Sequence, residues 1–247
     1  MEKWVGYTGD MQSAKRLEKD LRQAAHGRSA EDIAFIGRFF KTHKGGYGEG
    51  DIFIGAKVPL IRAVCKNYKD MPLAEIETAL ESPTHEVRLA AVIIMANQTK
   101  KAGALHKKAL FDLYLRRTDR INNWDIVDSS CRDVVGEYLL DKPRNTLYKL
   151  ARSDNLWERR IAMVSTWAFI RHGEIDDTFK IAELLLRDKH DLIHKAVGWM
   201  LREAGKKVGH APLKRWLGNH YTHMPRTALR YAIEHFDVQT RQHYLQK

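Results

Sequence analysis

Apolar residues recur at three- and four-residue spacing along this 247-residue chain, and only six prolines interrupt the pattern. That period gathers apolar side chains on one face of a helix, whereas the alternation typical of strands is almost absent. Residues 92–94 (Val-Ile-Ile) could be taken for a strand, but the helical spacing continues on both sides of them. The sequence therefore predicts an all-α fold.

Four helix openings resemble one another, at Thr84, Trp124, Trp157 and Leu192. Their starts lie 40, 33 and 35 positions apart, within the period of two-helix repeats that stack into a solenoid with a concave face. Chance similarity among amphipathic helices is the alternative. The spacing favours the repeat interpretation.

The first fifty residues differ from the rest. Helices are expected over 13–26 and 30–43, and the glycine-rich stretch 45–50 should form a loop. It is not a phosphate-binding Walker loop, because it lacks Gly-Lys-Ser/Thr and no strand precedes it. We predict one domain over 1–247, with N-terminal helices and a glycine-rich connection to about residue 50 and helical repeats over 51–247.

The chain has two cysteines, Cys65 and Cys131, which excludes a disulfide framework and fits a reducing cytosol. No apolar run approaches the roughly 18 residues of a membrane span, and the first residues lack an apolar signal core. We expect a soluble, cytoplasmic monomer.

Lysine and arginine total 42 against 31 acidic residues, for a net charge of +11. The excess is greatest over 202–230, where seven basic residues and one acid give a local charge of +6. A phosphate-binding surface would have this composition, and its affinity would fall with salt. A solvated helical face with no ligand is the alternative.

No metal centre or catalytic nucleophile is expected. His190 and His194 are one helical turn apart, but the glutamate and third ligand of a zinc hydrolase are missing, and we expect Asp191 to cap the helix that follows. No serine lies in a Gly-x-Ser-x-Gly turn, and neither cysteine has a catalytic signature.

Trp124 and Asp128 are one helical turn apart and should share a helix face. A carboxylate on a basic surface would repel nucleic acid unless it met a cation. Alternatively, Trp124 is a core residue and Asp128 pairs with an arginine such as Arg132.

Two later stretches combine aromatic and basic residues. An Asp/Asn cap at 154–155 precedes a helix that carries Arg160, and Lys195, Trp199 and Arg202 lie along one stripe of another helix. Gly198 in that second helix costs about 1 kcal/mol relative to alanine, which suggests close packing there.

Four ordered stretches, at 53–59, 123–128, 153–160 and 195–203, resemble the AlkD-type DNA alkylation-repair proteins, and the similarity runs from about Phe39 to Tyr244. These are bacterial DNA glycosylases built from HEAT-like helical repeats. The resemblance implies an all-α, HEAT-like helical-repeat solenoid with a concave basic face. It also implies excision of cationic N3- or N7-alkylated purines from duplex DNA, without metal or cofactor.

By motif, Asp128 corresponds to the catalytic carboxylate of the family, Trp124 and Trp199 to the aromatic pair at the lesion, and Arg160 to the arginine on the phosphate side. DNA-binding cations are expected at Lys57, Arg62, Lys195, Arg202, Lys206, Lys207, Lys214 and Arg215. The partner would be double-stranded DNA, which would place the protein at the nucleoid.

Two other functions fit the sequence. Some relatives are thought to bind DNA without excision, and this chain has Asp191-Leu192 where active members often have aromatic residues. A non-catalytic HEAT-like protein that recognises distorted duplex is therefore one alternative. A scaffold for an acidic protein is the other.

Overall fold

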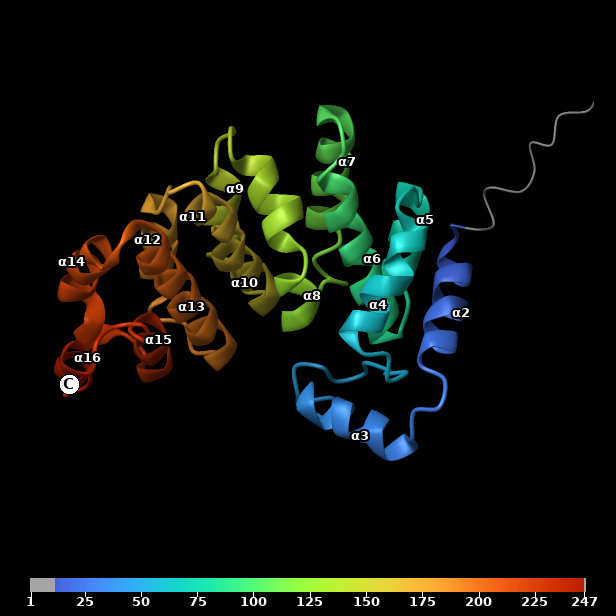
Figure 1. Cartoon of the computed structure of the whole chain (residues 1–247), viewed down its shortest axis with the longest axis horizontal. Helices are drawn as coiled ribbons and strands as arrows, with labels where there is room; N and C mark the ends of the chain where they lie inside the picture. Colours follow the sequence, from blue (N-terminus) through green and yellow to red (C-terminus); the bar gives the residue numbers. More distant parts are fainter. Residues whose placement is uncertain (1–11, 247) are drawn as a thin grey trace, which may run out of the picture. The chain divides into compact units, whose positions relative to one another are not determined.

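The computed structural model describes residues 12–246, and this part of the chain is all-helical, with fifteen α-helices and no strand (Figure 1). The prediction of an all-α fold is confirmed, and residues 92–94 lie inside a helix. The chain divides into two compact units, Met1–Ser130 (unit 1) and Cys131–Lys247 (unit 2), and each is described by itself. A single domain over 1–247 stays a prediction.

Unit 1 is a two-layered stack of helices. In one layer α4 contacts α6, and α6 contacts α8. The other layer consists of α5 and α7, and α2 packs on α4, α5 and α6. The central helix α6 is buried on almost every side. The helices of unit 1 are α2 (Ala14–Ala24), α3 (Ala30–Phe39), α4 (Val58–Cys65), α5 (Leu73–Leu80), α6 (His85–Thr99), α7 (Ala104–Arg116) and α8 (Trp124–Asp128), with a 3-10 helix at Lys66–Tyr68.

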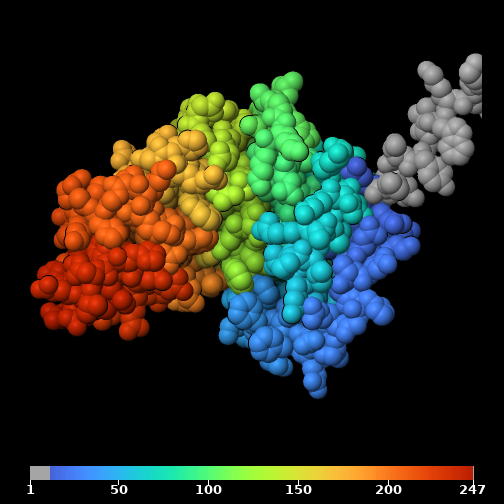
Figure 2. Space-filling view, viewed as in Figure 1, coloured from blue at the N-terminus to red at the C-terminus, as the bar shows by residue number. Residues whose placement is uncertain are grey.

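Helix α3 stands apart from this stack. It contains no buried residue, and it lies beyond the ends of α2 and α4 at the lower edge of unit 1 (Figures 1 and 2). It ends at Phe39, four residues before the predicted end, because the chain turns through Lys41, which has a positive φ, into the glycine-rich loop. Phe35 and Phe39 are 63% and 59% exposed, so α3 presents an aromatic surface that unit 1 does not cover.

Unit 2 is built around α13, which packs against α10, α11, α12, α14 and α15. Its elements are a π-helix (Arg132–Gly136), a 3-10 helix (Glu137–Leu139), α9 (Asn145–Leu150), α10 (Leu156–Ser165), α11 (Trp167–Arg171), α12 (Asp176–Leu185), α13 (Asp191–Val208), α14 (His210–His220), a 3-10 helix (Tyr221–His223), α15 (Arg226–Ala232) and α16 (Val238–Leu245).

The close packing predicted at Gly198 is confirmed. A Cβ at this position would lie 2.4 Å from the carbonyl oxygen of Ala228 and 2.5 Å from the Cβ of Tyr231. Only glycine therefore lets α13 approach α15 to this distance.

The helix openings that suggested repeats are the starts of α6, α8, α10 and α13. Asn123 and Asn155 cap α8 and α10 by accepting a backbone N–H, as expected for asparagine. The expected cap at Asp191 is wrong by one position: the Nδ1 of His190 accepts the Leu192 N–H, and Asp191 lies in the first turn of α13.

Both cysteines are buried, and the thiol of Cys65 faces the carbonyl oxygen of Ala90. In the described part of the chain, no helix is long and apolar enough to cross a membrane.

Candidate functional site

Trp124 and Asp128 lie at opposite ends of the single turn of α8, and both side chains are half-buried. The side-chain oxygen of Asn123 accepts the Trp124 N–H at 2.8 Å and fixes the start of the helix. The sequence suggested Arg132 as a partner for Asp128. The guanidinium of Arg132 forms an ion pair with Asp133 at 2.9 Å and lies over the Trp167 ring.

An aromatic stack covers one side of Trp124. The Phe40 ring is stacked on it, with centroids 5.2 Å apart and planes 9° from parallel, and Phe39 meets it edge-on at 5.9 Å. Phe40 continues the stack to Phe53 at 5.1 Å. Trp124 is therefore held by the loop after α3 and is neither a fully buried core residue nor an isolated surface ring.

Beneath this stack lies a buried cluster of charged side chains. His85, at the start of α6, is 1% exposed. Its Nδ1 lies 3.0 Å from a carboxylate oxygen of Asp51, and its Nε2 lies 2.8 Å from one of Asp125, the second residue of α8. Arg88 donates to the other oxygen of Asp51 at 2.5 Å. The cluster thus joins the loop, α6 and α8.

The cluster perturbs the ionisation of its members. Burial alone would lower the pKa of His85, but the hydrogen bonds to Asp125 and Asp51 outweigh it and raise the pKa to about 9. Burial opposes ionisation of Asp51, yet His85 and Arg88 lower its pKa below the ordinary value. His85 is therefore a cation at neutral pH, enclosed between two carboxylates.

Glu86 attaches the end of the loop to α6. Its carboxylate accepts the N–H groups of Ile54 and Gly55 at 2.8–3.1 Å. Gly55 has a φ of +85°, a conformation that favours glycine. Burial raises the pKa of Glu86 although these backbone bonds act in the opposite direction. The 51–55 segment is thus fixed by two neighbouring side chains, His85 and Glu86.

Arg160 and Trp199 belong to unit 2. Arg160 is buried on α10 and donates to the carbonyl oxygen of Leu192 at 2.5 Å, which ties α10 to the first turn of α13. Trp199, on α13, is half-buried and meets the Trp167 ring edge-on at 5.2 Å. Trp124 of unit 1 and Trp199 of unit 2 are thus each half-buried beside another aromatic ring.

Among the expected DNA-binding cations of unit 1, Lys57 and Arg62 are exposed. Arg62 lines a pocket of about 820 Å³ at the far end of α4 and α6. Asp70 is the one acid among its lining residues, and the other basic side chains there are Lys66, Lys69, Lys100, Lys101 and His106.

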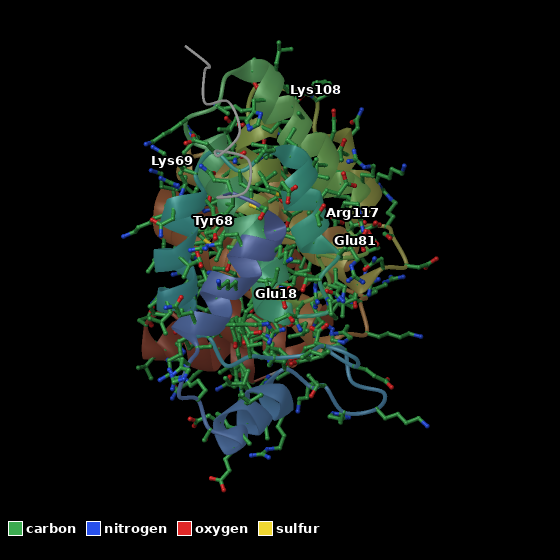
Figure 3. The ribbon with its side chains drawn as sticks, turned by 90° about the vertical axis from the view of Figure 1, so that its right-hand side faces the viewer. Glu18, Tyr68, Lys69, Glu81, Lys108 and Arg117 are labelled. Carbon is green, nitrogen blue, oxygen red and sulfur yellow. The ribbon has the colours of Figure 1, made fainter. Side chains whose placement is uncertain are left out.

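The opposite side of unit 1 is different. There Arg117 pairs with Glu81, and Arg116 pairs with Glu77 at 2.9 Å. Figure 3 shows Arg117 and Glu81 together on one side and Lys69 on the other. The pocket with Arg62 is therefore one part of unit 1 where basic side chains gather with little acid.

In unit 2 the expected cations differ in their surroundings. Lys206, Lys207, Lys214 and Arg215 are exposed on α13 and α14. Arg202 is held by Glu203 and Glu234, Lys206 reaches Glu203 at 3.2 Å, and Lys195 reaches Asp191 at 2.7 Å. These acids offset part of the local positive charge.

Sequence reasoning missed the Asp51–His85–Asp125 cluster. In the sequence, the stretch that begins at Thr84 indicates only the opening of a helix. Its signal was the succession of His85, Glu86 and Arg88 on a helix that is otherwise apolar, since charged groups in such a helix need buried partners.

A family profile described as DNA alkylation repair enzyme matches residues 17–236 of this chain. A solved structure described as "Predicted DNA alkylation repair enzyme from Enterococcus faecalis" is similar to it, with a TM-score of 0.65 and 17% sequence identity, over 85% of this chain and 97% of that one. At that identity the likeness shows the fold alone. A search of curated proteins found no match.

Proposed function

Since the chain belongs to the family of DNA alkylation repair enzymes, we propose that it is a DNA glycosylase that removes cationic N3- and N7-alkylated purines from duplex DNA. The observation that carries the proposal is the pairing of Trp124 and Asp128 on the one turn of α8, with Trp124 backed by Phe40. The reaction requires no metal or cofactor.

An alkylated purine is a good leaving group because it already carries a positive charge. The bond between its ring nitrogen and the sugar C1′ breaks with both electrons passing to the base, which leaves neutral. Water then adds to C1′ and gives up a proton. The positive charge that grows on the sugar is what the protein must stabilise, and a fixed carboxylate at about 3 Å does this.

Asp128 takes that role. It stabilises the sugar cation and orients the attacking water. Trp124 and Trp199 offer aromatic faces to the cationic sugar or base, each worth about 0.5–2 kcal/mol, and they exclude water that would screen the carboxylate. Arg160 supports the site from the phosphate side.

Cations of both units hold the duplex. Lys57, Arg62 and the basic pocket beside it bind backbone phosphates from unit 1, and Lys195, Arg202, Lys206, Lys207, Lys214 and Arg215 do so from unit 2. Duplex DNA is then the partner of a monomer, and the protein acts at the nucleoid. The exposed Phe35 and Phe39 of α3 supply an aromatic surface for a nucleobase next to Trp124.

The decisive experiment measures release of N7-methylguanine and N3-methyladenine from methylated duplex DNA. Wild type should release both, and Asp128→Asn should be slower by about a hundredfold or more, because a neutral amide cannot balance the sugar cation. Asp112→Asn, which removes a carboxylate from the exposed side of α7, should match wild type.

Equal release by wild type and Asp128→Asn would disprove the mechanism. Tight, salt-dependent duplex binding by wild type with no release above the spontaneous rate would instead identify a non-catalytic protein that recognises damaged duplex.

A further inference from the structure

His85 faces a carboxylate with each of its two ring nitrogens. A neutral imidazole has one N–H, so it can donate to Asp51 or to Asp125 but leaves the other carboxylate opposite a lone pair. The protonated ring donates to both. Protonation also balances the charge of the buried group, since Asp51 and Asp125 are then matched by His85 and Arg88.

The surroundings of the ring contain few other charges. From α6, Glu86 lies next to His85 in sequence, and its carboxylate is bonded to the loop N–H groups. Arg88 lies one turn along and faces Asp51. The loop contributes Asp51 and α8 contributes Asp125. Phe53 stacks on the ring at 4.5 Å, and Phe40, tilted by 45° to it, lies 5.0 Å away.

Two connections run from this ring to α8. The first is the hydrogen bond to Asp125, whose other oxygen accepts the Ile126 N–H at 2.9 Å and so belongs to the first turn of the helix. The second runs through Phe40, which touches the imidazole on one side and stacks on Trp124. A helix of five residues has few hydrogen bonds of its own to fix its direction.

We propose that His85 is a positioning residue: as an imidazolium it fixes α8 to the loop and to α6, and thereby sets the orientation of Trp124 and Asp128. When the ring loses its proton, it can donate to only one of the two carboxylates, so the loop and α8 are no longer both tied to α6 through it. The effect on base release rests on the proposed function, but the orientation of Trp124 does not.

The first test uses the wild-type protein, labelled with ¹⁵N-histidine and fluorotryptophan. Both nitrogens of His85 should carry protons at pH 7, and the fluorine resonance of Trp124, assigned with Trp124→Phe, should shift with the pH at which His85 titrates. The proposal would be overturned if one ring nitrogen of His85 carried no proton at pH 7. It would also be overturned if the Trp124 resonance did not change as His85 titrates.

The second test compares His85→Gln with His26→Gln, which changes an exposed histidine at the end of α2. His85→Gln should move the Trp124 resonance, and His26→Gln should not. The double variant His85→Gln/Asp125→Asn restores an uncharged hydrogen-bonding pair, so it should bring the resonance back and remove its pH dependence. An unmoved resonance in folded His85→Gln would contradict the positioning role.

Base release gives the third readout. His85→Gln should lower kcat at least about tenfold while KM for methylated duplex changes less than about twofold, because misplacing the catalytic group affects the chemical step. Wild-type kcat should fall as the pH rises through the titration of His85. If wild type releases no base, the glycosylase proposal fails while the resonance of Trp124 still decides the role of His85.

Discussion

Trp124 of unit 1 and Trp199 of unit 2 are both half-buried and both have an aromatic neighbour, but different forces hold them. Trp124 rests on Phe40 above the buried ion cluster of His85. Trp199 follows Gly198, whose lack of a side chain lets α13 close onto α15. Electrostatic support depends on pH, whereas steric support depends on volume. The two tryptophans should therefore respond to different perturbations.

The largest expected effect concerns pH. The pKa of His85 is raised to about 9 in the folded protein, above its ordinary value of 6.5, so the stability it contributes is complete below about pH 6.5 and is lost as the pH rises through 9. The full contribution is about 3 kcal/mol. Urea unfolding of wild type and His85→Gln should show a stability difference that is largest at pH 6 and shrinks toward pH 9.5. Parallel curves at all pH values would refute this linkage.

The next effect concerns volume. Gly198→Ala should destabilise the protein by about 2 kcal/mol, because the new methyl meets the Ala228 backbone, which cannot move aside as a flexible side chain could. Gly218→Ala is the matched control, since a Cβ there meets nothing within 4 Å in helix α14. It should stabilise by up to about 1 kcal/mol. Thermal unfolding measures the change in stability of both variants. Equal changes for Gly198→Ala and Gly218→Ala would show that close packing does not require glycine at position 198.

The smallest effect concerns the cations. If both units bind backbone phosphates, Lys100→Gln/Lys101→Gln should lower the slope of log K against log salt by about two, and Lys206→Gln/Lys207→Gln by only about one, because Glu203 already holds Lys206. Lys108→Gln, at a lysine paired with Asp112, should leave the slope unchanged. Fluorescence anisotropy with undamaged duplex provides these slopes. If Lys206→Gln/Lys207→Gln lowered the slope more than Lys100→Gln/Lys101→Gln, unit 2 and not unit 1 would make more of the phosphate contacts.

The features of the fold that the sequence predicts are those that depend on neighbouring residues. The helix starts and the cap at Asn155 depend on residues within a turn or two of one another, so periodicity and capping signals reveal them. A glycine inside a helical pattern indicated the close packing at Gly198, but not its partners Ala228 and Tyr231 on α15. The error at Asp191 is of the same kind: His190 and Asp191 are adjacent, both side chains can accept a hydrogen bond, and the pattern does not separate them.

The partners of His85 could not be found in this way. Asp51 and Asp125 lie 34 and 40 positions from it, far beyond the three- and four-residue period of a helix. The 40-position spacing of the helix openings indicates repeats and does not identify the side chains that meet. The pairing exists because the loop returns to the start of α6 and α8 packs beside it. Trp124 and Asp128 were singled out by their spacing, but what holds them depends on tertiary structure.

The burial of the two cysteines has a consequence for a protein that meets DNA damaged by alkylating agents. A thiolate is the strongest nucleophile a side chain offers, and such agents methylate it readily. Cys131 and Cys65 are shielded within unit 2 and unit 1, and burial raises the pKa of Cys65 to about 12. In the folded chain the two thiols are thereby protected from the reagents that create its proposed substrate.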